Sequence, residues 1–121
     1  MNTHLADFYS KLLKKQEATY PLEFYRFLYE LITTTAFSEK LMLKGDVKEY
    51  HLSPKRICSL FGINIKQEFG IFSAFVLQTW GITTSKDIGV AIFKMAEYNT
   101  LKLSGTETIE EFISAGLEFP A

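Results

Sequence analysis

The sequence has little of what most recognisable protein chemistry requires. Its 121 residues include one cysteine, two histidines and three prolines. A single cysteine, Cys58, excludes an internal disulfide framework and is typical of a reducing compartment. Neither a Gly-x-Gly-x-x-Gly nor a Gly-x4-Gly-Lys-Ser/Thr pattern occurs, so nucleotide binding through those loops is unsupported. We expect no catalytic residue, no cofactor and no metal site, and so a protein that is not an enzyme.

Two side chains, one histidine and one cysteine, could take part in catalysis or metal binding, but the sequence favours a non-catalytic role for each. His51 lies near Asp46 and Glu49, but the spacing matches no metal-ligand pattern, and an exposed loop histidine is the simpler interpretation. Cys58 lies about one turn into an expected helix, on its apolar side. Packing is therefore a simpler role for this thiol than nucleophilic catalysis.

Targeting signals and membrane spans are also missing from the sequence. No basic and then apolar opening segment precedes a small-residue cleavage site, which argues against a signal peptide. No run approaches the roughly 18 apolar residues that a spanning helix needs. We therefore expect a cytoplasmic protein that does not associate with a membrane.

Basic residues are scarce in the second half of the chain. Residues 1–66 carry ten Lys/Arg and seven Asp/Glu (+3), whereas residues 67–121 carry three and seven (−4). The last base is Lys102, and four glutamates follow it. This acidic end disfavours a polyanionic partner, because phosphate contacts depend on Lys and Arg.

Apolar material, by contrast, is plentiful. Hydrophobic residues make up 47% of the chain, and 11 Phe, 6 Tyr and 1 Trp are among them. A chain of this length and composition can bury a core without disulfides or metals. We expect a single domain over residues 1–121.

Apolar periodicity and capping signals predict a mainly helical fold of about five helices. The expected helices cover residues 3–17 at the surface, a segment from Pro21 to about Leu43, a segment from Pro54, about 71–80, and 85–98. Whether the helix that begins at Pro54 ends at Gly62 or continues to Phe69 stays open. The segment 71–80 is apolar on nearly every side, which predicts a central helix wrapped by the others.

A small β element is expected near the C-terminus. Leu101–Leu103 alternates in polarity like a short strand, and Ser104–Gly105 is a turn signal. The segment 108–119 fits either a second strand or a short helix. The order of three helices followed by a strand and a turn also resembles that of a winged-helix domain.

Several blocks of the chain are similar in order and spacing to a family of small uncharacterised bacterial proteins, a domain of unknown function. The similar blocks are Tyr20–Leu28, His51–Ile57, Gln67–Gly70, Trp80–Gly89, Ile92–Met95 and the acidic Thr106–Phe112. The similarity covers about residues 20–121 and leaves out the first helix. It implies a bacterial, cytoplasmic, mostly helical domain and assigns no catalytic residue.

Two functions from different classes remain as hypotheses. Tyr25 and Tyr29 lie one turn apart outside the main apolar stripe of the second helix, which favours a surface for a protein partner or a second copy. The alternative is that the first helix covers these rings. A winged-helix-like regulator would instead use Lys86, Lys94 and Lys102, although this sparse set disfavours nucleic-acid binding.

Overall fold

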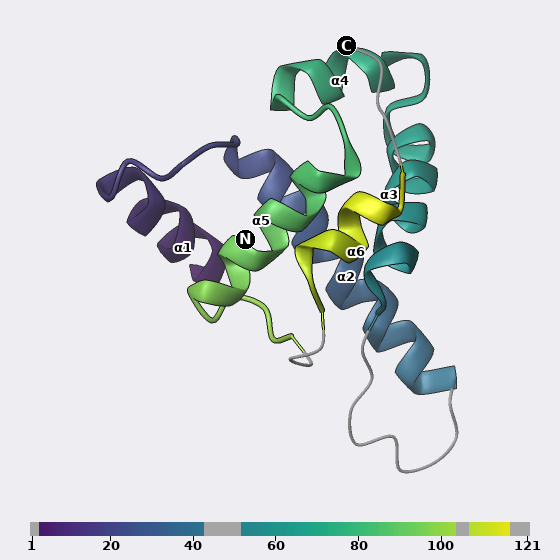
Figure 1. Cartoon of the computed structure of the whole chain (residues 1–121), viewed down its shortest axis with the longest axis horizontal. Coiled ribbons are helices and arrows are strands. Elements are labelled where there is room, and N and C mark those ends of the chain that lie inside the picture. Colours follow the sequence, from purple (N-terminus) through teal and green to yellow (C-terminus); the bar gives the residue numbers. More distant parts are fainter. Residues whose placement is uncertain (1–2, 43–51, 104–106, 117–121) are drawn as a thin grey trace.

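The computed structural model describes residues 3–42, 52–103 and 107–116, and its regular structure is helical. The helices are α1 (Thr3–Lys14), α2 (Leu22–Met42), α3 (Pro54–Phe69), the short 3-10 helix η1 (Gly70–Phe72), α4 (Ser73–Trp80), α5 (Ser85–Glu97) and α6 (Ile109–Ser114). The predicted mainly helical fold is confirmed. Figure 1 shows α5 between α1 on one side of the molecule and α3 on the other, with α4 running across the end of α3.

Local capping interactions define where the later helices begin. The Ser53 hydroxyl accepts a hydrogen bond from the Arg56 amide, and Pro54 occupies the first turn, as the sequence predicts. Thr84 and Asp87 form a capping box at the start of α5. Each cap satisfies amide groups that the first turn of a helix leaves without a partner.

Residues in the left-handed backbone conformation follow the ends of three of the helices. After α4, Gly81 has a φ of +76°, and the Ile82 amide donates to the Leu77 carbonyl at 3.0 Å. The same closing hydrogen bond follows Gln16 (φ +58°) after α1 and Asn99 (φ +60°) after α5. This pattern is the Schellman motif, which satisfies the last carbonyls of a helix.

Gly70 separates α3 from α4. Helix α3 passes through Gly62 and ends at Phe69, and Gly70 then takes a φ of +52°. Ser73 Oγ donates to the Gly70 carbonyl at 2.7 Å, which closes the turn. Among the described residues, Pro54–Trp80 is the one helical stretch that is long and apolar enough to cross a membrane. One such stretch is weak evidence for a membrane-spanning segment. Its two helices run in different directions, so it is no continuous rod (Figure 1).

One contiguous core joins α1 to α6, and α5 lies at its centre. Ile88, Ala91, Ile92 and Met95 of α5 are fully or almost fully buried. Rings from α1, α2 and α3 belong to the same core and pack on one another in edge-to-face and tilted pairs, such as Phe24 and Phe61 with centroids 6.0 Å apart. Aromatic pairs of this kind stabilise a core beyond the area they bury.

The expected C-terminal β element is wrong within the described residues. No strand occurs in 3–42, 52–103 or 107–116, and the second segment forms helix α6, the other alternative. Thr108 and Glu111 make a capping box, which favours a helix. Leu101–Leu103 is not a strand, and the turn predicted at Ser104–Gly105 lies outside the described residues.

Helix α6 packs into the angle between α5 and α3. Phe112 is fully buried, and its carbonyl accepts a hydrogen bond from the buried Ser85 hydroxyl at 2.5 Å. Gly89 of α5 allows the close approach, because a Cβ there would lie 2.7 Å from both Ile109 Cδ1 and Phe112 Cγ. Gly89 is therefore a position of close packing between α5 and α6.

Candidate functional site

Tyr25, the first residue predicted to bind a partner, is in the core. Its side chain is 1% exposed, and its ring packs edge-to-face on Phe8 with centroids 5.1 Å apart. Burial raises the pKa of its hydroxyl to about 12. Helix α1 covers this ring with a buried stripe that includes Leu5, Phe8 and Leu12. The prediction that Tyr25 forms a docking surface is therefore wrong.

Tyr29 lies at the edge of the same layer. Its ring is half-buried and packs against the core. Its backbone carbonyl accepts a hydrogen bond from the Thr33 hydroxyl at 2.7 Å. A role for Tyr29 in partner binding stays a prediction, and without Tyr25 it no longer belongs to an aromatic pair at the surface.

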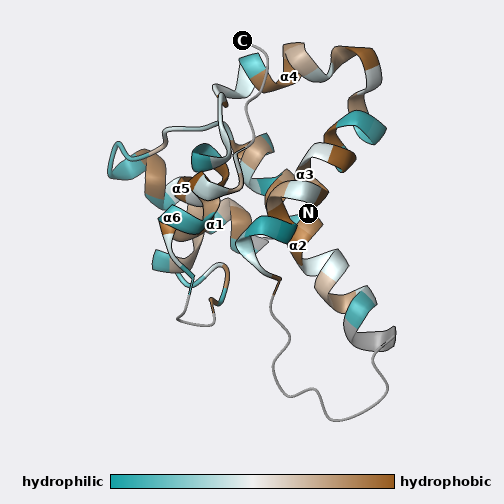
Figure 2. Cartoon of the chain, turned by 45° about the vertical axis from the view of Figure 1, so that its right-hand side comes forward, coloured by the Kyte–Doolittle hydropathy of each residue, from teal (hydrophilic) through white to brown (hydrophobic). Residues whose placement is uncertain are grey.

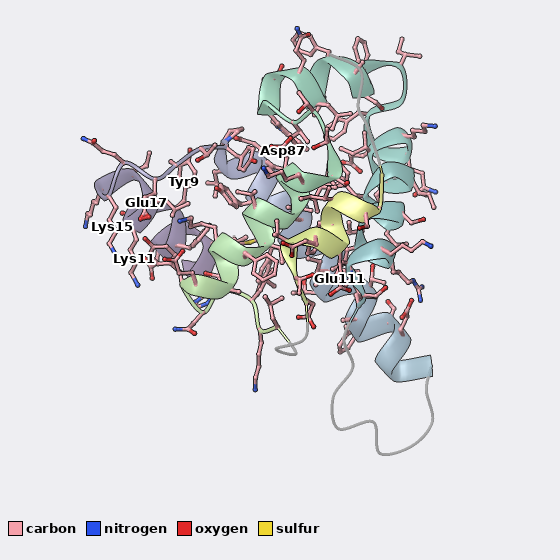
Figure 3. The ribbon with its side chains drawn as sticks, viewed as in Figure 1. Tyr9, Lys11, Lys15, Glu17, Asp87 and Glu111 are labelled. Atoms are coloured by element: carbon pink, nitrogen blue, oxygen red, sulfur yellow. The ribbon has the colours of Figure 1, made fainter. Side chains whose placement is uncertain are left out.

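Instead, three large and exposed apolar side chains lie close together along the chain in η1 and α4. Ile71 is 93% exposed, Phe72 64% and Phe75 68%. We call these three residues the η1–α4 face. Figure 2 shows the hydrophobic colouring of this segment at the edge of the molecule, and Figure 3 shows side chains projecting outward from it.

Helical spacing places the three residues of the η1–α4 face together. Phe75, in the first turn of α4, lies three residues after Phe72 and four after Ile71, and in continuous helical structure residues at these spacings are neighbours at the surface. The opposite side of α4 holds the helix in place through Leu77 and Trp80, which are both buried. Phe75 therefore lies on a helix whose orientation its buried side fixes, and η1, with Ile71 and Phe72, directly precedes that helix.

Trp80 makes the main contacts beneath α4. Its ring lies 5.8 Å from Phe24, 5.6 Å from Phe27 and 5.8 Å from Phe69, measured between centroids. Ser73 Oγ also lies 3.2 Å from the Ile65 carbonyl of α3. These contacts tie a short helix to α2 and α3 along one side only.

The prediction of a wrapped central helix over 71–80 is consequently wrong. The regular α-helix has eight residues and packs mainly against α3 and η1, while Trp80 at its end reaches the α2 rings of Phe24 and Phe27. A helix of about two turns at the end of α3 offers one side to the core, so its remaining apolar side chains face solvent. The sequence signal that identifies this surface is an apolar helix bounded closely by Gly70 and Gly81.

The η1–α4 face is electrostatically neutral. Residues 69–85 include no Asp, Glu, Lys, Arg or His. The nearest charges along the chain are Lys66 and Glu68 before it and Lys86 after it, and all three side chains are exposed. An apolar, uncharged surface favours contact with another apolar surface over recognition of an ion.

The three lysines of the nucleic-acid hypothesis do not form a basic patch. Lys86 and Lys102 are exposed, near opposite ends of α5. Lys94 Nζ lies 3.4 Å from Glu17 Oε2 and 3.2 Å from Glu97 Oε2, so two carboxylates offset its charge. Hydrogen bonding to Glu97 and Glu17 raises the pKa of Lys94 although burial opposes this. Figure 3 shows Glu17 at the same end of the molecule as Lys11 and Lys15.

Other candidate groups make structural contacts. Cys58 is buried, as its packing interpretation predicts, and burial raises the pKa of its thiol to about 11. The Tyr20 hydroxyl donates to Asp87 Oδ1 at 2.6 Å, and the Thr83 amide donates to Asp87 Oδ2 at 2.8 Å.

In the described part of the chain, no three His, Cys, Asp or Glu side chains are arranged to hold a metal ion. His51 lies outside that part.

Comparisons with known proteins assign no role to these residues. The similarity to small uncharacterised bacterial proteins stays a prediction, and the η1–α4 face rests on its own geometry. No protein-family model, no curated protein and no solved structure matches this chain.

Proposed function

We propose that the chain is a non-enzymatic protein-interaction module that binds its partner through the η1–α4 face. The observation that carries this proposal is the exposure of three large apolar side chains within five residues, Ile71 and Phe72 of η1 and Phe75 of α4, next to the side of α4 that the core holds in place. The bacterial and cytoplasmic setting implied by the sequence resemblance is part of the proposal.

The size of the face supports a functional role. From the area that aromatic side chains bury, the three residues expose on the order of 400 Å² of apolar surface. Contiguous apolar patches of roughly 300–600 Å² are the largest on typical monomers and are often functional. A fully buried partner-facing Phe contributes to binding through the same transfer of apolar surface out of water that stabilises a core.

Other exposed apolar side chains provide a comparison. Leu13 of α1 and Phe37 of α2 are 57% and 65% exposed, respectively. They lie on separate helices, and single exposed apolar residues are normal on protein surfaces. Phe37 is therefore a matched control position, similar in residue type and exposure to Phe72 and Phe75 but outside the η1–α4 face.

Site-specific photo-crosslinking tests the proposal. A benzophenone amino acid is placed at position 71 of the full chain in one variant and at position 37 in another, in cells of the organism that makes it. We expect irradiation to give a discrete covalent protein adduct from position 71, because a bound partner must lie within reach of that side chain. Position 37 should give none.

Two outcomes would contradict the proposal. The first is that position 71 gives no discrete protein adduct. The second is that positions 71 and 37 give the same set of adducts, because random collisions with abundant proteins would then explain both.

A further inference from the structure

We propose that the partner seated on the η1–α4 face is a second copy of this chain, related to the first by a two-fold axis. This inference rests on the proposed function, since it names the partner of the same surface. In such an interface both copies use the same patch, so the patch must be complementary to itself.

The absence of charge makes the η1–α4 face complementary to itself. A charged residue near a two-fold axis meets its own counterpart, and like charges brought together at an interface cost several kcal/mol. No charged residue occurs over 69–85, so neither repulsion nor an unpaired buried charge arises. Apolar side chains, by contrast, pack equally well on identical side chains.

Polar residues close to the face along the chain also suit a copy of themselves. Gln67 and Gln78 are both exposed. An amide side chain carries a donor and an acceptor, so it can pair with the same amide from the other copy. Lys66 and Glu68 are exposed and opposite in sign, which allows each to face the other type across the rim of a two-fold interface.

The exposed apolar area of the face is close to the apolar area that each copy of a stable dimer buries. A standard interface buries roughly 800 Å² on each partner, and the homodimer class is roughly 65% apolar. The required apolar area is thus on the order of 500 Å² per copy. Ile71, Phe72 and Phe75 expose on the order of 400 Å², so half-buried apolar neighbours can supply the rest of the apolar area and polar residues the rim.

A membrane surface is a poorer match to the same residues. Helices that lie in a membrane interface combine an apolar face with Lys or Arg on the polar face. Helix α4 has neither residue. The neutral polar positions of α4, such as Gln78 and Thr79, suit the rim of a protein interface better.

Sedimentation equilibrium of the full chain over a range of concentrations tests this inference. We expect the wild type to have twice the 13.9 kDa mass of the chain and to dissociate on dilution. The substitution Ile71→Glu should weaken dimerisation at least about 100-fold, because it buries two unpaired carboxylates at the interface. The matched control Phe37→Glu should dimerise like the wild type.

The other possible results of sedimentation also support or overturn the inference of a dimer. Since Ile71 is 93% exposed, Ile71→Glu should leave the helical circular dichroism unchanged, and Phe75→Glu provides a second variant that must also give a monomer. A wild type that stays monomeric at about 200 µM overturns the inference. So does a dimer that both variants leave intact, or a monomer that binds anionic vesicles through these residues.

The photo-crosslinking experiment separates the two proposals. An adduct at position 71 with twice the mass of the chain supports self-association. If the adduct contains a different protein and the wild type is monomeric, the proposed interaction function is supported and the inference of a dimer is overturned. The absence of any protein adduct overturns both.

Discussion

At the scale of single residues, Gly89 is the position where α5 and α6 come closest. The substitution Gly89→Ala adds a Cβ 2.7 Å from Phe112 Cγ and 2.8 Å from Phe112 Cβ, so one helix must move. We expect the free energy of unfolding to fall by about 1–3 kcal/mol, the usual range for overpacking a core. Urea denaturation followed by circular dichroism measures this change.

Gly62 is the matched control for Gly89, because it also lies inside a helix. A Cβ at Gly62 meets nothing within 4 Å, so Gly62→Ala is free of overpacking. We expect this variant to raise the free energy of unfolding by about 0.5–1 kcal/mol, since alanine has the higher helix propensity. If both variants shift stability in the same direction, the close approach at Gly89 is not what distinguishes the two positions.

At the scale of secondary-structure elements, one hydrogen-bonded carboxylate joins the start of α2 to the start of α5. Asp87 accepts from the Tyr20 hydroxyl and from the amides of Thr83 and Thr84. Partial burial acts to raise the pKa of Asp87, but these hydrogen bonds together hold it below its usual value. Its carboxylate therefore stabilises the fold fully at neutral pH, and this contribution is lost as the pH falls below about 4.

The substitution Tyr20→Phe tests this connection. It should lower the free energy of unfolding at pH 7 by about 1–2 kcal/mol, because it removes a hydrogen bond to a charged acceptor. The difference from the wild type should narrow as the pH falls below about 4 and Asp87 becomes protonated. Urea denaturation at several pH values measures both effects.

Tyr29→Phe is the control for the Tyr20→Phe variant. The Tyr29 hydroxyl makes no hydrogen bond within the described residues, so its removal should change stability little at any pH. A Tyr20→Phe variant whose stability runs parallel to that of the wild type from pH 7 to pH 2 would show that Tyr20 does not act on Asp87.

At the scale of the whole molecule, Cys58 reports on global unfolding. It is the only cysteine of the chain, it is 1% exposed, and burial raises the pKa of its thiol to about 11. Both effects keep the reactive thiolate out of reach in the folded protein. We expect a thiol reagent to label the native chain at least about 1,000-fold more slowly than the chain in urea.

An added surface thiol controls for the reagent itself. The substitution Leu13→Cys introduces a thiol at a position that is 57% exposed and outside the η1–α4 face. This variant should show one fast and one slow reaction. Native labelling of Cys58 at a rate close to that of the added thiol would mean that α3 opens locally, without global unfolding.

The helix boundaries and the core of α5 could be predicted from the sequence. Ser53–Pro54, Thr84–Asp87 and Gly81 place helix ends where the structure has them. The periodic apolar positions of α5, including Ile88 and Ile92, are buried as the pattern predicts. These features depend on residues within about one helical turn, so a local pattern contains the information.

The candidate site could not be predicted in the same way. Tyr25 and Phe75 are both large aromatic residues on apolar helices, and one is 1% exposed whereas the other is 68% exposed. Composition and periodicity do not separate them. The difference is that α1 packs over Tyr25, while no described element covers the outer side of α4.

The sequence by itself thus determined the helical class and the positions of many helix ends, because caps and turns form between residues a few positions apart. Only the tertiary structure decided which apolar faces are buried, since burial depends on contacts between residues far apart in the chain. The α6 segment illustrates both levels. Its capping box is local, but its close fit against Gly89 exists only once α5 and α6 meet.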